Sequence, residues 1–220
     1  IPSYRLPRDV LDEEITYVKK HGVEIINGER IKKPSELLAK GFNAVFVGTG
    51  ASSSRKLRIE GEDASGVYHA LEFLDEFNLG KKFKLGDRVA VIGGGNAAID
   101  SARVALRLGA KEVIIVYRRS KEEMPAIASE IEDAEHEGID IKILSSPVKI
   151  LEEDGKATTL RCIEMKLGEP DSSGRRRPVP IPDSEFDIDI DSVIVAIGQG
   201  IDAEDYFSDL EYSEWGLIEI

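Results

Sequence analysis

The feature that most constrains the fold is a glycine-rich turn between an apolar strand and a helix. Residues 89–98, VAVIGGGNAA, run from a buried strand through Gly-x-Gly-x-x-Ala into a helical pattern. In such a turn Gly93 permits the tight bend, Gly95 lets the backbone approach a dinucleotide pyrophosphate, and Ala98 allows close helix packing. The N-terminus of the helix at Asn96 directs free N–H groups and a positive dipole end at that pyrophosphate. The alternative is the same turn without a ligand. The predicted pyrophosphate contacts are Gly93, Gly94, Gly95, Asn96, Ala97 and Ala98.

Strands and helices alternate around this turn. After Gly86 the pattern predicts a strand, helix, strand, helix and strand at residues 88–92, 96–108, 112–117, 124–137 and 139–144. This alternation indicates a parallel sheet with helices on both faces. Longer alternating strands then predict a β-meander, at residues 148–151, 157–167 and 186–190, with a polar tip at 168–182. An apolar strand follows at 192–197. The predicted fold class is α/β, a Rossmann-like parallel sheet with flanking helices plus a β-meander.

The first fifty residues predict a helix, a strand, a helix and a strand, at residues 7–20, 23–26, 34–40 and 44–47. The first helix begins with a proline, carries acidic residues early and lysines late, and stops at Gly22. Residues 51–63 are rich in serine, glycine and charge, which is typical of a connecting loop. We therefore predict a domain boundary near Gly61. The sequence has no initiator methionine at Ile1, and we expect it to be a piece of a longer polypeptide.

The residues after the second strand of the motif indicate which dinucleotide binds. An NAD site places an acidic residue there, about 20 residues beyond the glycine turn, whereas arginine accommodates the 2′-phosphate of NADP. Here the strand ends in Arg118, Arg119 and Ser120. Arginine donates paired hydrogen bonds to a phosphate dianion. The pattern therefore favours NADP(H) and disfavours FAD, which has no 2′-phosphate. The alternative is an exposed basic strand end on an acidic protein.

Composition excludes several classes of function. The 220 residues include 29 Lys and Arg against 42 Asp and Glu, a net charge of −13, so we expect no nucleic-acid partner. No apolar run approaches the roughly 18 residues that a membrane span needs, and we expect no membrane partner. Cys162 is the single cysteine. It cannot form an internal disulfide or a Cys-x-x-Cys pair, which favours a cytoplasmic location.

Other candidate side chains are weaker. His21, His69 and His136 lack carboxylates or cysteines at ligand spacing, so no metal site is predicted. The basic cluster at residues 175–177 lies between a glycine and a proline, where a solvated loop is favoured over a docking patch. Cys162 lies within an apolar strand pattern and is interpreted as a core residue. We predict no catalytic side chain.

Four separated stretches together carry a family resemblance. They are IPSYRLP at residues 1–7, IGGGNAAIDSARVALRLGA at 92–110, VYRRSKEEMPA at 116–126 and VIVAIGQ at 193–199. In this order they resemble the NADPH-dependent small (beta) subunit of glutamate synthase and its relatives, a family that also resembles part of dihydropyrimidine dehydrogenase. In that family an NADPH domain is inserted into an FAD domain. Electrons pass from NADPH to FAD and through iron–sulfur clusters to a partner subunit.

The resemblance implies roles for individual residues. Gly93 to Ala98 would hold the NADPH pyrophosphate, and Arg118 with Arg119 the 2′-phosphate. The nicotinamide half would pass Ala196, Ile197 and Gly198, and the FAD side of the domain junction would include Gly48, Thr49 and Gly50. Residues 1–60 would then flank the FAD domain, 61–198 would form the NADPH domain, and 199–220 would return to the FAD domain.

The resemblance also sets expectations for what lies outside these residues. The family's FAD-binding glycine motif and cysteine-rich cluster domain would precede Ile1, and its Gly-Asp flavin motif would follow Ile220. We therefore expect this stretch alone to hold FAD poorly and to be inactive without the remainder of the FAD domain and an electron-accepting subunit. Thioredoxin reductase shares the two-domain plan, but it needs a Cys-x-x-Cys in this domain. A sequence with one cysteine does not fit that enzyme. A regulatory domain that senses NADP(H) without transferring electrons is the alternative function.

Overall fold

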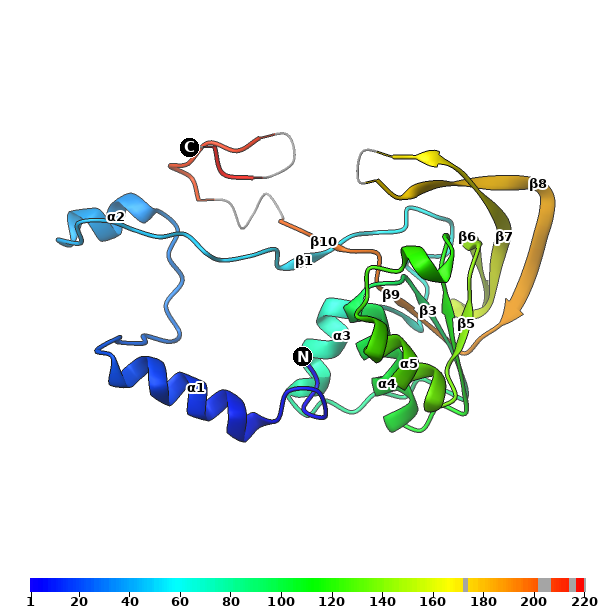
Figure 1. The fold of residues 1–220 in the computed structure, drawn as a ribbon, viewed down its shortest axis with the longest axis horizontal. Helices are drawn as coiled ribbons and strands as arrows, with labels where there is room; N and C mark the ends of the chain where they lie inside the picture. The colour runs from blue at the N-terminus through cyan, green and yellow to red at the C-terminus, as the bar shows by residue number, and fades with distance from the viewer. Residues whose placement is uncertain (172–173, 202–206, 214–216, 220) are drawn as a thin grey trace. The chain divides into compact units, whose positions relative to one another are not determined.

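The computed structural model describes residues 1–171, 174–201, 207–213 and 217–219 (Figure 1). The chain divides into two compact units, one of residues 1–2 with 54–198 and the other of residues 3–53 with 199–220. The helices are α1 (Arg8–Lys20), α2 (Pro34–Ala39), α3 (Ala70–Asn78), α4 (Asn96–Arg107), the 3-10 helix η1 (Lys121–Glu123) and α5 (Ala128–His136). The strands are β1 (Ser53–Ser54), β2 (Val67–His69), β3 (Arg88–Ile92), β4 (Glu112–Val116), β5 (Asp140–Lys142), β6 (Ser145–Glu153), β7 (Lys156–Pro170), β8 (Arg176–Asp189), β9 (Ser192–Val195) and β10 (Gln199–Gly200).

A five-stranded parallel sheet forms the centre of the 54–198 unit. Its order is β2-β9-β3-β4-β5, so β3 lies in the middle with β9 on one side and β4 on the other. In β3, residues 89–92 are all buried, and all four residues of β9 are buried. These strands read as continuous apolar runs because neighbouring layers cover both of their faces. The predicted Rossmann-like parallel sheet is confirmed.

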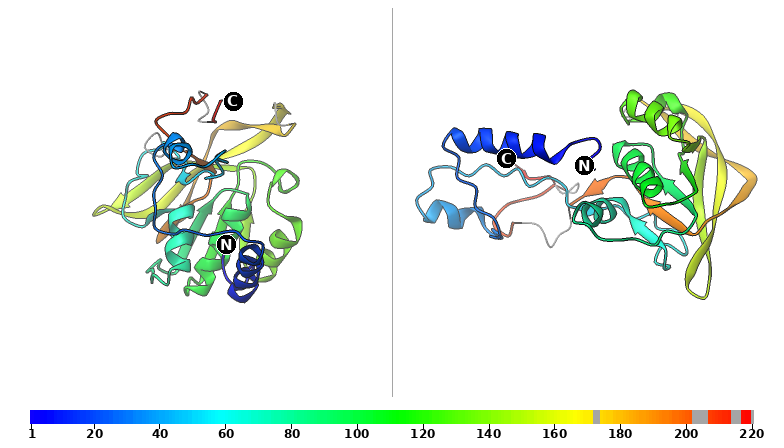
Figure 2. Two further views of the ribbon diagram at one scale, coloured as in Figure 1. Left: turned by 90° about the vertical axis from the view of Figure 1, so that its left-hand side faces the viewer. Right: turned by 90° about the horizontal axis from the view of Figure 1, so that it is seen from below.

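The two faces of this sheet have different coverings. Helices α3, α4 and α5 lie on one face, and the three-stranded antiparallel sheet β6-β7-β8 lies on the other (Figure 2). One apolar cluster joins Ile92 and Val193 of the parallel sheet to Ile150 and Leu160 of the meander. The prediction of helices on both faces is therefore wrong. The alternating pattern of β6 to β8 gives the meander an apolar face of its own, and burying that face against the sheet leaves no room for helices there.

Element boundaries differ from the predictions where prolines and long-range hydrogen bonds intervene. The helix predicted at 124–137 starts only at Ala128. Pro125 disfavours a helical conformation at the preceding residue, and Met124 has φ −66° and ψ 124°. The β7–β8 hairpin is longer than predicted, since β7 extends to Pro170 and β8 begins at Arg176. The polar tip is correspondingly shorter.

The unit of residues 3–53 and 199–220 contains α1 and α2, as predicted. The strands predicted at 23–26 and 44–47 are absent from this described part of the chain, where neither segment has regular secondary structure. Phe46 in the second of them is 95% exposed. A β-branched or aromatic run becomes a strand only where a neighbour pairs its N–H and C=O groups. Across the described residues, none of the helices has the length and apolar character needed to cross a membrane.

Candidate dinucleotide-binding site

Two of the three glycines in the turn after β3 are required by packing. Gly93 has φ 142°, and a Cβ there would lie 2.2 Å from the carbonyl oxygen of Ala196. A Cβ on Gly94 would lie 2.5 Å from Cδ2 of Tyr117. Any side chain at either position would collide with a neighbouring strand end. These two glycines therefore fix the tight bend between the sheet and α4.

Gly95 is different because an added Cβ there would make only an ordinary van der Waals contact. Its φ is −94°, which any residue can adopt, and the nearest atom to an added Cβ is Cγ of Pro125 at 3.9 Å. Gly95, Asn96 and Ala97 are partly exposed, whereas Ala98, in the first turn of α4, is fully buried. These partly exposed residues lie at the N-terminus of α4, where free N–H groups favour an anion. The turn thus fits the pyrophosphate of a dinucleotide.

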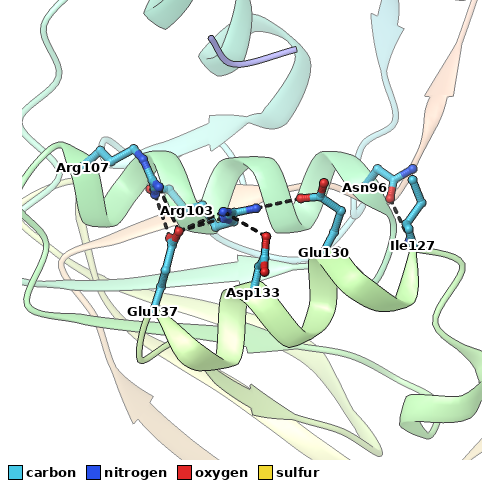
Figure 3. Close-up of polar contacts among 7 residues, drawn as sticks. All are labelled: Asn96, Arg103, Arg107, Ile127, Glu130, Asp133 and Glu137. Carbon is cyan, nitrogen blue, oxygen red and sulfur yellow. Dashed lines mark hydrogen bonds and ion pairs between the residues drawn. The ribbon is translucent and has the colours of Figure 1, made fainter. Parts of the chain in front are cut away.

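The segment that follows the second strand of the motif packs onto this turn. The backbone N–H of Ala126 donates to the carbonyl oxygen of Gly94 at 3.2 Å. The N–H of Ile127 donates to Oδ1 of Asn96 at 3.0 Å (Figure 3). These bonds keep residues 124–127 out of α5 and hold them beside the glycine turn. Sequence reasoning assigned Asn96 to the pyrophosphate and did not find this role.

Salt bridges between α4 and α5 extend this attachment. Arg103 of α4 is buried, and its Nη1 lies 2.7 Å from Oε2 of Glu130. Its Nη2 lies 2.9 Å from Oε1 of Glu137 and 3.4 Å from Oδ2 of Asp133. Arg107 also pairs with Glu137, at 2.7 Å (Figure 3). The helix at the candidate dinucleotide site, α4, is thereby linked to α5, the helix that follows the arginine pair.

The residues predicted to bind the 2′-phosphate have separate environments. Arg118 is exposed, and the structure gives its guanidinium no ion pair among the described residues. Arg119 is buried, with Nη2 2.6 Å from Oδ2 of Asp171 and Nε donating to the carbonyl oxygen of Arg176 at 2.8 Å. Ser120 donates its hydroxyl hydrogen to Oε2 of Glu123 at 2.8 Å. Of the three, Arg118 is the one free to meet a ligand.

Glu123 is the centre of contacts that sequence reasoning did not assign. Desolvation raises its pKa, but hydrogen bonds from Arg176 and Ser120 outweigh this effect and lower the pKa of Glu123 to about 2. The hydroxyl of Tyr117 donates to its carbonyl oxygen at 2.7 Å. The spacing Ser-x-x-Glu at 120–123 is the sequence signal of a capping box, which the structure forms at the start of η1. The Arg176 contact spans 53 residues and has no local signal.

The carboxyl end of β9 places three more of the predicted residues. Ala196 follows β9 and donates its N–H to the carbonyl oxygen of Ile92 at 2.8 Å, directly beside the glycine turn. Ile197 is 39% exposed at the same sheet edge. The carbonyl oxygen of Gly198 accepts from the N–H of Arg55 at 3.1 Å. The three residues predicted on the FAD side lie in the other unit, where all are exposed: Gly48, Thr49 and Gly50.

A parallel sheet with this glycine turn at the carboxyl end of its central strand defines an FAD/NAD(P)-binding type of domain. The comparisons with known proteins give the family. Residues 7–220 match the pyridine nucleotide-disulphide oxidoreductase family, and the chain belongs to it.

Named relatives agree with the family resemblance drawn from the sequence. The chain is 44% identical to the NADP(+)-dependent formate dehydrogenase subunit beta of Moorella thermoacetica, over 100% of this chain and 32% of the relative. It is 44% identical to the NADPH-Fe(3+) oxidoreductase subunit beta of Geobacter sulfurreducens, over 99% and 34%. It is 34% identical to the glutamate synthase [NADPH] small chain of Escherichia coli, over 90% and 45%. The predicted resemblance is confirmed, and the chain spans between about a third and a half of these relatives.

Solved structures agree on the fold. The chain superposes on Mycobacterium tuberculosis FprA in complex with NADPH with a TM-score of 0.70 at 21% identity, covering 84% of this chain and 56% of FprA. Thioredoxin reductase of Lactococcus lactis gives a TM-score of 0.57 at 25% identity, covering 77% and 49%. These likenesses confirm the predicted fold class.

Proposed function

We propose that the unit of residues 54–198 is the NADPH-binding domain of a flavin-dependent oxidoreductase, in which hydride passes from NADPH to FAD and electrons go onward to a partner protein. The observation that carries this proposal is the glycine turn. Packing does not require a glycine at position 95, since an added Cβ would meet only Cγ of Pro125 at 3.9 Å, and the residue lies at the N-terminus of α4, where a pyrophosphate would bind. Relatives whose names include NADP or NADPH support the same nucleotide.

Different residues would bind different parts of the nucleotide. The backbone from Gly93 to Ala98 would take the pyrophosphate, and exposed Arg118 would bind the 2′-phosphate directly. Arg119 was predicted to share that phosphate. Since its charge already pairs with Asp171, we propose that it orients the strand end that carries Arg118. The nicotinamide half would pass Ala196, Ile197 and Gly198. The nicotinamide supplies the hydride and the flavin accepts it, so no side chain here need act as a general acid or base.

The whole protein is the proposed catalyst. FAD would be held by the remainder of the FAD domain together with residues such as Gly48, Thr49 and Gly50. Iron–sulfur clusters in further segments or in an electron-accepting subunit would carry the electrons away, in the cytoplasm. The relatives named as subunits support a partner of this kind.

Nucleotide titration tests the 2′-phosphate assignment. We expect NADPH to bind more tightly than NADH. The Arg118→Ala variant should bind NADPH about 10-fold more weakly, because one charge-assisted contact is lost. NADH affinity should change by less than about twofold. Parallel losses for both nucleotides that disappear in added salt would instead indicate long-range attraction by an exposed charge.

Flavin chemistry separates electron transfer from sensing. The full-length protein should purify yellow and reduce an artificial dye with NADPH. A colourless protein that binds NADPH but reduces no dye would reject the oxidoreductase proposal and favour the NADP(H)-sensing alternative.

A further inference from the structure

The end of the β7–β8 hairpin is attached to the loop after β4 at two points. Arg119 donates from Nε to the backbone carbonyl of Arg176 at 2.8 Å, and it pairs with Asp171 at 2.6 Å. Arg176 in turn donates from Nε to Oε1 of Glu123 at 2.7 Å. Both the backbone and the side chain of Arg176 are therefore held against the loop that carries Arg118.

The carboxylate of Glu123 is a negative charge on the loop proposed to bind the 2′-phosphate. Its other carboxylate oxygen accepts from the Ser120 hydroxyl at 2.8 Å. Ser120 is two residues from Arg118, so the Cα atoms of the two lie within about 7 Å. Charges held on one short loop are only partly screened at physiological ionic strength, where the Debye length is about 8 Å. An uncompensated Glu123 carboxylate would repel a phosphate dianion bound at Arg118.

We propose that Arg176 is a specificity-determining residue for NADPH over NADH, because its guanidinium cancels the charge of Glu123 beside the phosphate-binding loop. This inference rests on the proposed function. It gives a role to one member of the basic cluster at 175–177, which the sequence pattern favoured as a solvated loop. NADH has no 2′-phosphate, so the compensation matters only for NADPH.

Arg177 is a matched control in the same strand. Successive side chains of a strand point to opposite faces, so Arg177 faces away from the side that carries the Glu123 contact. It is exposed, and the described residues include no ion-pair partner for it. Removing either arginine changes the net charge equally. Only the removal of Arg176 should leave the negative charge of Glu123 without its arginine partner.

The test measures dissociation constants of NADP⁺ and NAD⁺ for the full-length protein and three variants. We expect Arg176→Ala to raise the dissociation constant of NADP⁺ about 5-fold or more and that of NAD⁺ less than about 2-fold. Arg177→Ala should leave both dissociation constants within about 2-fold of those of the unchanged protein. Adding Glu123→Gln to Arg176→Ala should restore NADP⁺ binding, since glutamine keeps the capping bonds but carries no charge.

Other outcomes overturn the proposal. Equal losses of NADP⁺ and NAD⁺ in Arg176→Ala would show a general disturbance of the loop. Equal NADP⁺ losses in Arg176→Ala and Arg177→Ala would show a diffuse field, and failure of Glu123→Gln to rescue would exclude charge compensation. If the unchanged protein itself binds NADP⁺ no better than NAD⁺, the proposed function fails rather than this assignment.

Discussion

At the scale of single residues, the three consecutive glycines of the turn are present for different reasons. Gly93 and Gly94 are imposed by neighbouring strand ends, since a Cβ would lie 2.2 Å from an Ala196 atom in the first case and 2.5 Å from a Tyr117 atom in the second. At Gly95 an added Cβ would meet only Cγ of Pro125, at 3.9 Å, so packing does not require this glycine, and the proposed pyrophosphate contact would give it a role. The spacing of the motif predicted the tight bend at Gly93. Sequence reasoning assigned Gly94 to the pyrophosphate and did not find its close approach to Tyr117.

Replacing Gly95 with Val separates folding from binding. We expect the protein to fold normally, because φ is −94° and the closest described atom to an added Cβ is 3.9 Å away. NADPH and NADH should both bind at least about 10-fold more weakly, since the side chain occupies the space of the pyrophosphate they share. Titration with each nucleotide and thermal unfolding measure the two effects. Undiminished binding would place the nucleotide elsewhere.

Gly93→Val provides the matched comparison. A β-branched side chain at φ 142° is strained and also collides with Ala196. This variant should lose about 3 kcal/mol or more of unfolding free energy, which denaturant titration measures. A stable Gly93→Val protein would contradict the packing described for the turn.

The arginine pair shows where residue-level prediction ends. Residue type and position identified Arg118 and Arg119 as a basic strand end, and one of the two is exposed as a ligand requires. That Arg119 is buried against Asp171 depends on a hairpin end 52 residues further along the chain. Local sequence carries no signal for such a pairing.

At the scale of elements, β3, β4 and α4 were predicted to within about two residues because their signals are local. Both strands have continuous apolar cores, and Gly95 and Gly109 bracket the helix. The start of α5 was not predictable from helical periodicity alone. It depends on Pro125 and on bonds that hold Ala126 and Ile127 against the glycine turn.

The attachment of α5 to α4 should depend on pH. Hydrogen bonds from Arg107 and Arg103, opposed by desolvation, lower the pKa of Glu137 from 4.5 to about 2. A depressed pKa in the folded state means that the carboxylate stabilises the fold above about pH 4.5 and loses this effect as the pH falls toward 2. Glu137→Gln should therefore lower the unfolding free energy by about 1–3 kcal/mol at pH 7. The deficit should shrink below pH 4.5.

Denaturant titrations at pH 7, 4 and 3 measure this deficit. Glu132→Gln is the control, because Glu132 is an exposed residue of the same helix with no ion pair among the described residues. It should change stability by less than about 0.5 kcal/mol at each pH. A Glu137→Gln deficit that stays constant down to pH 3 would mean that the arginine contacts do not hold the carboxylate ionised.

At the scale of the whole molecule, the sequence predicted the types of layer better than their arrangement. Alternating strands and helices indicated the parallel sheet, and the change to alternating hydrophobicity after Pro147 indicated the meander. Which layer covers which face depends on contacts between distant segments, such as Ile150 and Leu160 against Ile92 and Val193. The meander is consequently part of the central core and not an appendage to the sheet.

Cys162 can report on this core directly. It lies on β7 within the cluster shared by the meander and the parallel sheet, and it is 0% exposed. Burial raises the pKa of its thiol to about 12. A thiol reagent at pH 8 should therefore modify Cys162 only during opening of the core, far more slowly than in denaturant.

Weakening the core should accelerate that modification. Ile150→Ala removes a side chain that is 1% exposed in the same cluster and should cost about 2–5 kcal/mol, so the labelling rate should rise by more than about 10-fold. Lys166→Ala, at an exposed position of β7, should leave the rate within about 2-fold. Mass spectrometry of the Cys162 peptide against time measures both rates. Labelling of the unchanged protein as fast as in denaturant would contradict the placement of the meander over the sheet, because an open meander would expose the thiol without any unfolding.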